Sequence, residues 1–204
     1  MHNNHRRSQN LSEAQGQVLV RLARHTLMDR LGKQIPQAEL DSLNTALKDS
    51  CFKSLCGTFV TLKINERLRG CIGNLTSDTP LASGVRRNTI NAAFHDPRFA
   101  PLDAPELDRV EIEISILSEP QPLKYRDGDD LIKKLRPHID GVIIRKDHAS
   151  ATFLPQVWEQ LPRPQDFLAH LCTKAGLATN FWQNPELAVS TYQVQYFEEH
   201  TGRS

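Results

Sequence analysis

The sequence lacks three features that would each place a protein in a particular class. No run of about 18 apolar residues occurs, so no membrane-spanning helix is predicted. The first ten residues, MHNNHRRSQN, contain no apolar segment of the kind that a secretory signal needs. Charges nearly cancel, with 25 Lys and Arg against 24 Asp and Glu, and aromatic side chains make up 6% of the residues. Because nucleic-acid binders normally carry a clustered basic excess, this composition argues against nucleic acid as a partner.

The common motifs for metal and nucleotide sites are also missing. The sequence contains no HExxH, no GxxxxGK[ST] phosphate loop and no GxGxxG. Cys51 and Cys56 are separated by four residues, but no second Cys/His pair follows at the usual zinc-ligand distance. We therefore expect no metal site and no bound cofactor. We also expect a cytoplasmic protein, in which Cys51, Cys56, Cys71 and Cys172 remain free thiols rather than a disulfide framework.

The periodicity of apolar residues predicts an α+β fold. Ser12 and Gln15 have the spacing of a capping box, and the helix that follows is expected to stop at Gly32. GTFVTLKI (57–64) and LRGCIG (68–73) read as a hairpin, in which INER (64–67) supplies the turn. STYQVQYF (190–197) predicts a single terminal strand. Helices mixed with hairpins favour a mainly antiparallel sheet flanked by helices.

The segment RVEIEISIL (109–117) gives the clearest strand pattern. Its isoleucines occupy one face, whereas Glu111, Glu113 and Ser115 occupy the other. Two carboxylates about 7 Å apart on one face can serve acid/base chemistry, but glutamates on a half-exposed strand are more often simply solvated. Around this central part, residues 1–10 and 198–204 are predicted to be polar tails, and residues 11–197 a single domain.

Cys71 is the first candidate for chemistry. Residues two apart on a strand share a face, so Arg69 and Cys71 would be neighbours, and a nearby cation favours the reactive thiolate. Gly70 and Gly73 would then let a ligand approach the backbone closely. The structural alternative is that Cys71 packs as a small apolar residue while Arg69 pairs with an acid elsewhere.

The segment AAFHDPRF (92–99) carries the second group of candidates. His95 would lie at the C-terminal end of a helix, and with Asp96 or Glu113 it would complete a Cys/His/acid set around Cys71. The alternative is a helix that ends at Asp96-Pro97, with Arg98 paired to an acid. The sequence alone leaves both open.

Five segments follow one another in the order found in one protein family. They are GTFVTLKINERLRGCIGNL, NAAFHDPRFAPL, EIEISILSEPQPL, GVIIRKDHASATFLPQVWEQLP and FLAHLCTKAGL. Over residues 11–197 the chain resembles the AMMECR domain family, the "Amme" component of AmmeMemoRadiSam systems. The resemblance implies an α+β fold with a larger and a smaller lobe, and it places LRGCIG at the cleft between them. His95 departs from the arginine that many relatives carry there, which weakens its case as a general base.

The resemblance implies partners but no agreed activity. It associates the chain with a Memo-like protein and a radical S-adenosylmethionine protein inside the cell. One hypothesis is an enzyme that acts through Cys71 and Arg69 on a small molecule or peptide, in a pocket shaped by Gly70, Gly73, Asp96, Arg98 and Glu113. The other is a non-catalytic adaptor that binds its partner proteins through the same cleft. The sequence does not decide between them.

Overall fold

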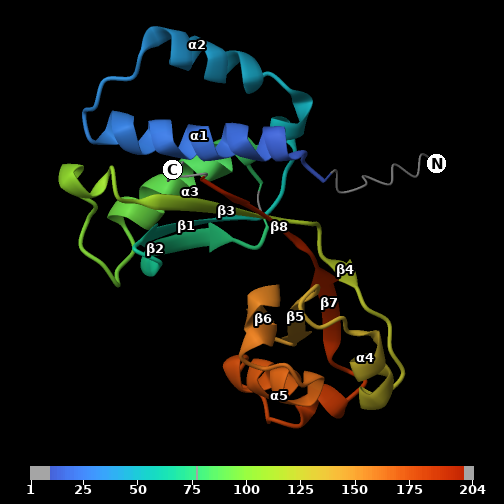
Figure 1. Cartoon of the computed structure of the whole chain (residues 1–204). Coiled ribbons are helices and arrows are strands. Elements are labelled where there is room, and N and C mark those ends of the chain that lie inside the picture. Colours follow the sequence, from blue (N-terminus) through green and yellow to red (C-terminus); the bar gives the residue numbers. More distant parts are fainter. Residues whose placement is uncertain (1–9, 77, 200–204) are drawn as a thin grey trace. The chain divides into compact units, whose positions relative to one another are not determined.

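The computed structural model describes residues 10–76 and 78–199, which divide into two compact units (Figure 1). One unit contains the chain up to Leu117 together with the segment from Gln195, and the other runs from Ser118 to Val194. The described residues form five α-helices and two four-stranded antiparallel sheets, which confirms the α+β prediction. Within this part of the chain, no helix combines the length and the apolar character needed to cross a membrane.

The predicted tails fall mostly outside the described residues. Residues 1–9 and 200–204 lie beyond them. At the C-terminal side, Glu198 is the last residue of a strand, and Glu199 is ion-paired with Arg24.

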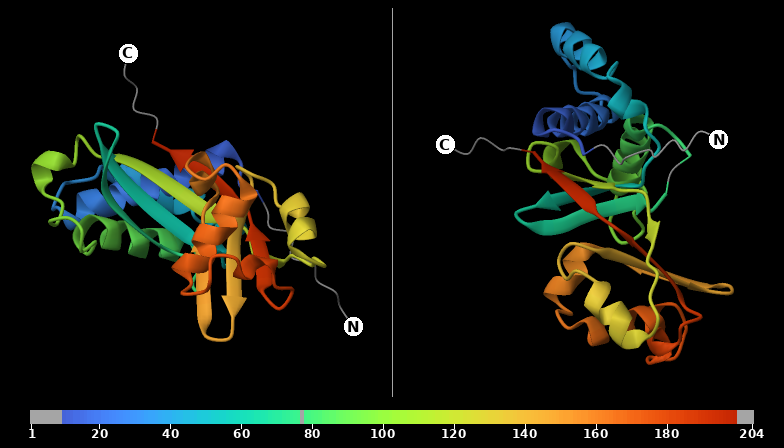
Figure 2. Two further views of the ribbon diagram at one scale, coloured as in Figure 1. Left: turned by 90° about the horizontal axis from the view of Figure 1, so that it is seen from below. Right: turned by 90° about the vertical axis from the view of Figure 1, so that its right-hand side faces the viewer.

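The first unit is a sheet with helices on one face. Its strands have the order β2-β1-β3-β8, and α1 and α3 lie together on one side, with α2 beyond α1 (Figures 1 and 2). In chain order its elements are α1 (Glu13–Arg30), α2 (Gln37–Ala46), η1 (Ser50–Lys53), β1 (Thr58–Ile64), β2 (Arg67–Asn74), α3 (Leu81–Phe94), η2 (Ala104–Glu106), β3 (Glu111–Leu117) and β8 (Val194–Glu198). The core lies between the helices and the sheet, because the buried isoleucines of β3 and the leucines of α1 belong to one cluster.

Local sequence signals account for the boundaries of these elements. Ser12 caps α1 in a complete capping box with Gln15, and Gly32 takes a φ of +69° just after the helix, as predicted. The β1–β2 hairpin turns on Asn65 and Glu66, whose φ values of 52° and 63° suit a two-residue turn of type I′.

The second unit has its own sheet and its own core. The sheet has the order β4-β7-β5-β6, and Figure 2 shows its β5–β6 hairpin. In chain order its elements are β4 (Gln121–Pro122), α4 (Gly128–Lys134), β5 (Gly141–Lys146), β6 (Ala149–Phe153), η3 (Pro155–Glu159), α5 (Pro164–Lys174), η4 (Phe181–Gln183) and β7 (Ala188–Tyr192). Trp158 is fully buried in its core and stacks on Phe167, with ring centroids 3.7 Å apart.

The prediction of one terminal strand over residues 190–197 is wrong. The segment forms β7 and β8, which belong to different sheets, and the break falls at Gln193. At the break, the Gln193 amide donates to Ser118 Oγ and the Ser118 amide donates to the Gln193 carbonyl. These bonds satisfy the polar groups that leave the ladder, so the chain changes sheets without a glycine or a proline.

Candidate active site around Cys71

The site begins with an irregularity in the β1–β2 hairpin. Leu62 opposes Gly70, but the next residue along β1, Lys63, opposes Leu68, so Arg69 is an extra residue in β2. Such a bulge breaks the alternation of side chains between the two faces. Beyond the bulge, Thr61 lies directly opposite Cys71.

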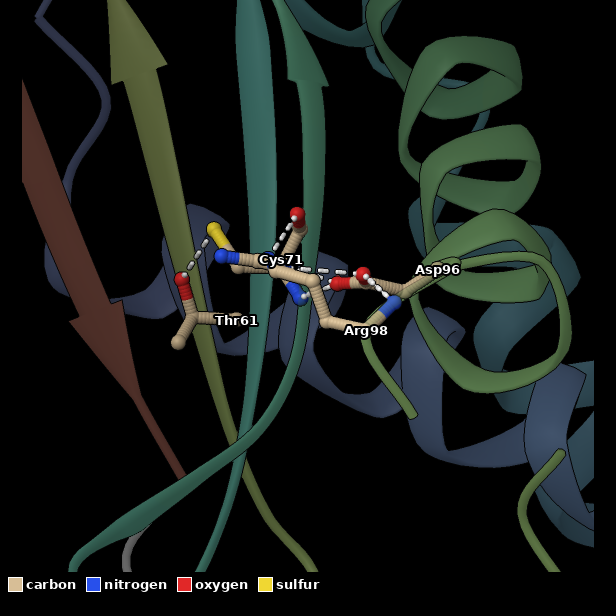
Figure 3. A network of polar contacts seen from close by, with 4 residues as sticks. All are labelled: Thr61, Cys71, Asp96 and Arg98. Carbon is tan, nitrogen blue, oxygen red and sulfur yellow. Dashed lines mark hydrogen bonds and ion pairs between the residues drawn. The ribbon is translucent and has the colours of Figure 1, made fainter. Parts of the chain in front are cut away.

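Thr61 and Cys71 form a close cross-strand pair (Figure 3). The Thr61 hydroxyl donates a hydrogen bond to Cys71 Sγ, with 3.3 Å between oxygen and sulfur. The backbone N–H and C=O of Cys71 are bonded elsewhere, so this is a pair without ladder hydrogen bonds, the type in which side chains approach most closely. The half-buried thiol is therefore held at a defined position on the sheet.

Asp96 and Arg98 hold the backbone of Cys71 from the open edge of β2. The Cys71 amide donates to Asp96 Oδ2 at 2.9 Å, and Arg98 Nη2 donates to the Cys71 carbonyl at 3.1 Å (Figure 3). Arg98 also binds both carboxylate oxygens of Asp96, through Nε at 2.9 Å and Nη2 at 2.6 Å. The ion pair therefore occupies the position that a further strand would take, and it satisfies the polar groups of an edge residue.

Burial raises the pKa of Asp96, whereas the interaction with Arg98 lowers it, and the lowering is the larger effect. Its side chain is 1% exposed, whereas that of Arg98 is 54% exposed. The Arg98 guanidinium, followed by the Cys71 and Arg98 amides, holds the pKa of Asp96 well below its usual range, although burial opposes the shift. The hydrogen bond to Asp96 raises the pKa of Arg98, and the charge of a Cys71 thiolate adds to this. Arg98, and not Arg69, is thus the arginine that hydrogen-bonds to Cys71, through the Cys71 carbonyl.

Arg69 does not take the place expected from its spacing to Cys71. As the extra residue of the bulge, it turns to η2 and binds Glu106 through two parallel bonds of 2.7 Å, from Nε and Nη2. Glu106 raises the pKa of Arg69, and Arg69 in turn lowers the pKa of Glu106. The structural alternative, in which Arg69 pairs with an acid elsewhere, is the arrangement observed.

Gly70 and Gly73 are required by packing within the protein. A Cβ on Gly70 would lie 2.1 Å from the carbonyl oxygen of Ala92 in α3, so the absent side chain lets helix and strand approach closely. A Cβ on Gly73 would lie 2.3 Å from the ring of Phe59, which opposes it on β1. The space beside these two glycines, which was expected to admit a ligand, is filled by Ala92 and Phe59.

The predicted Cys/His/acid set does not assemble. His95 ends α3 and is exposed, and the carboxylate of Asp96 contacts Arg98 and the Cys71 amide instead. Glu113 opposes Thr61 on its other side, but it binds Lys63 Nζ at 2.7 Å. It is 8% exposed, so it is a buried, paired carboxylate and not a solvated one.

The other three cysteines differ from Cys71 in their surroundings. Burial raises the pKa of Cys51 to about 11, and burial also raises the pKa of Cys56 and of Cys172. Cys51 and Cys172 belong to the two hydrophobic cores. They are packing residues, as free cysteines commonly are.

Sequence reasoning missed Thr61 and Lys63. The two-residue turn at Asn65 and Glu66 sets a register that would place Val60, a core residue, opposite Cys71. The bulge shifts the register by one residue, so that Thr61 and not Val60 lies opposite Cys71. The conflict itself, together with a glycine beside Arg69, was the available signal for the bulge.

Within the described ranges, 10–76 and 78–199, no three His, Cys, Asp or Glu side chains are grouped to hold a metal ion. The site is therefore defined by a thiol, a hydroxyl and two ion pairs, namely Asp96–Arg98 and Lys63–Glu113.

Comparison with known proteins gives one consistent result. A family model described as AMMECR1 matches residues 20–197. A protein of Methanothermobacter thermautotrophicus is 34% identical over 197 residues, covering 93% of this chain and 96% of its own. A protein of Methanopyrus kandleri is also 34% identical, covering 93% of this chain and 90% of its own. The crystal structure of uncharacterised protein PH0010 from Pyrococcus horikoshii has a TM-score of 0.76 and 30% identity, covering 95% of this chain and 96% of that one.

Proposed function

The chain belongs to the AMMECR1 family, and on that premise we propose that Cys71 is the centre of a thiol-dependent active site. The protein would act inside the cell together with a Memo-like protein and a radical S-adenosylmethionine protein, as its resemblance to the AmmeMemoRadiSam component implies. The position of the site in a cleft between lobes stays a prediction of that resemblance.

One observation carries the proposal: polar side chains form hydrogen bonds with the amide, the carbonyl and the sulfur of Cys71. Asp96 binds its N–H, Arg98 binds its C=O and Thr61 binds its Sγ. Cys51 is also held by polar side chains, since Asp49 binds its amide and Ser54 its carbonyl, but burial and the Asp49 carboxylate raise its pKa to about 11. The sulfur of Cys71 instead receives a hydrogen bond from a hydroxyl donor. Fixing a nucleophile in this way is what catalysis by a positioned thiolate requires.

The arrangement can form a covalent bond between sulfur and an electrophilic carbon. In such a step the Cys71 thiolate supplies the electron pair, and the leaving group departs with the electrons of the bond that breaks. The carbon that is attacked belongs to a small molecule or to a peptide of a partner, since both classes carry suitable electrophiles. Arg98, paired with Asp96, binds the carbonyl of Cys71 and so helps to fix the position of the thiol.

A second function, that of a non-catalytic adaptor, is favoured by a different observation. Asp96 and Arg98 bind the backbone of Cys71 and not its sulfur, so what they preserve is the shape of the edge strand β2. An edge strand of fixed shape can present side chains to a partner protein. In this case the thiol would be dispensable, but the small size of residue 71 would not.

Replacement of Cys71 in cells separates the two functions. In a prokaryote that encodes all three proteins, the gene is deleted and restored as wild type, Cys71→Ser, Cys71→Trp or the control Cys56→Ser. The metabolite profile and the recovery of both partners on the tagged protein are then measured.

For a thiol-dependent site, we expect Cys71→Ser to retain the partners but to show the profile of the deletion strain, because the hydroxyl of serine is a far weaker nucleophile at neutral pH. Cys56→Ser should match the wild type. A wild-type profile with Cys71→Ser would contradict thiol chemistry. If Cys71→Trp then loses both the partners and the profile, the adaptor function is supported.

A further inference from the structure

The hydroxyl of Thr61 is the polar group aimed at the sulfur of Cys71. Its oxygen lies 3.3 Å from Sγ, and the two residues are directly opposed across β1 and β2 (Figure 3). A threonine in a helix can donate to a carbonyl one turn back, as Thr26 and Thr89 do in this protein. A strand offers no such local acceptor, so the hydroxyl of Thr61 can donate to the sulfur of Cys71, its cross-strand neighbour.

The charged groups near this pair are already bound to one another. On the edge side of Cys71, Arg98 is joined to Asp96. On the other side of Thr61, Lys63 is joined to Glu113, which opposes Thr61 on β3. Each pair is neutral as a whole, so neither places an uncompensated charge beside the sulfur.

From this geometry we propose that Thr61 is a positioning residue for the Cys71 thiolate. Its O–H donates a hydrogen bond to the sulfur, and this bond stabilises the anionic form and fixes the direction in which Sγ points. The inference deepens the proposed function and rests on it, since a positioning residue has meaning only if the thiol reacts.

The hydrogen bond has two separable effects on reactivity. Donation to the anionic form raises the fraction of thiolate at a given pH, because a hydrogen bond to the charged state favours that state. The same bond limits the rotation of the Cys71 side chain. The first effect moves the pH at which the thiol becomes reactive, whereas a purely steric role would change the rate at every pH alike.

Alkylation of Cys71 by iodoacetamide tests the proposal on the full chain. The thiolate sulfur displaces iodide and forms a thioether, and mass spectrometry of the Cys71 peptide measures the rate from neutral to alkaline pH. Thr61→Val keeps the shape and the strand preference of threonine but removes the donor, and Thr61→Ser keeps the donor. Thr152→Val in β6 is the matched control, because its hydroxyl binds a backbone carbonyl in the other sheet. Cys71→Ser confirms which peptide carries the label.

We expect Thr61→Val to react about tenfold more slowly at neutral pH, with the half-maximal rate moved to higher pH and the alkaline plateau unchanged. Thr61→Ser and Thr152→Val should stay within about twofold of the wild type. Circular dichroism shows whether each variant is folded. If Thr61→Val is not folded, the comparison of Thr61→Ser with Thr61→Ala takes its place.

A pH profile of Thr61→Val that matches the wild type would overturn the inference. So would an equal loss in Thr61→Val and Thr61→Ser, or a lower plateau with an unchanged midpoint, since these indicate a steric role. The assay reads chemical reactivity and not activity in cells. Failure of the positioning role therefore appears here, whereas failure of the proposed function appears as a wild-type profile of the Cys71→Ser strain.

Discussion

Asp96 is a residue whose importance lies in what it holds in place. Its buried carboxylate accepts bonds from the Cys71 amide and from the amide, Nε and Nη2 of Arg98. Removal of a charged acceptor leaves these donors to find other partners in a place with little access to water. The site is therefore sensitive to a residue that does not reach the sulfur.

Asp96→Asn should lower the free energy of unfolding by about 2 kcal/mol, because hydrogen bonds to a charged group are lost. Arg98 is more than half exposed and can be solvated, which limits the loss. Urea unfolding measures the change. Asp108→Asn, at an exposed position, is the control and should be nearly neutral. Equal stabilities of the two variants would show that the ion pair contributes nothing.

The lowered pKa of Asp96 predicts a particular dependence on pH. A depressed carboxyl pKa adds stability that is complete above the unfolded value of about 4 and is lost as the pH falls through the folded value. The difference in unfolding free energy between the wild type and Asp96→Asn should therefore shrink from neutral pH to about pH 3. The pKa of Glu106 is also lowered, by its partner Arg69. Because Glu106 is present in both proteins, its contribution to the pH dependence cancels in this comparison. A difference that stays constant over this range would contradict the prediction.

At the residue level, the sequence predicted the candidate positions better than their contacts. Cys71, Asp96 and Arg98 do come together, but the contact of Asp96 is with the backbone of Cys71. The interaction of Arg69 with Glu106 depends on a bulge and on the short helix η2, in which Glu106 lies 37 residues further along the chain, and neither leaves a periodic signal. Spacing along one strand cannot show which of two faces a side chain takes once the alternation is broken.

Among the elements, close contact between β2 and α3 is what brings Asp96 to the edge of the sheet. Gly70 makes this contact possible, because its Cα faces the Ala92 carbonyl. In the same helix Gly84 has room for a methyl group, since a Cβ at that position would lie 3.5 Å from Thr58 Oγ1. The two glycines therefore have opposite roles.

Gly70→Ala should destabilise the protein by about 3 kcal/mol, since a rigid backbone carbonyl stands in the way of the new methyl group. Gly84→Ala should stabilise it by about 0.5–1 kcal/mol, because alanine favours a helix interior and meets only ordinary contacts. Thermal or urea unfolding measures both changes. Similar effects of the two substitutions would contradict this account of the helix–strand contact.

Most elements were predictable because their patterns are local. The capping box of α1, the β1–β2 turn and the alternation in β3 each depend on neighbours within a few residues. The division between β7 and β8 was not predictable, because the apolar pattern runs on without a break through Gln193. Only the partners of each half, β5 for one and β3 for the other, distinguish two strands from one.

On the scale of the whole molecule, the described residues form two hydrophobic cores with no residue in common. Both tryptophans of the sequence, Trp158 and Trp182, belong to the second core. Tryptophan fluorescence therefore reports on the second unit, whereas far-UV circular dichroism reports on both.

Gly70→Ala should separate the two signals. We expect an early phase in circular dichroism as the first unit unfolds, while the fluorescence midpoint stays at the wild-type value, because the second core is not altered. Val142→Ala, in the second core, is the control and should move the fluorescence midpoint. Coincident transitions for Gly70→Ala would show that the units unfold as one.

The place of β8 also has a consequence for synthesis on the ribosome. All strands of the second sheet are translated before β8, which is the fourth strand of the first. Until β8 emerges, β3 presents an unpaired edge, with Arg24 still lacking the carboxylate of Glu199. The nascent first unit is thus open to wrong pairing for as long as the later unit takes to be made, and a premature stop codon before residue 194 would leave it in that state.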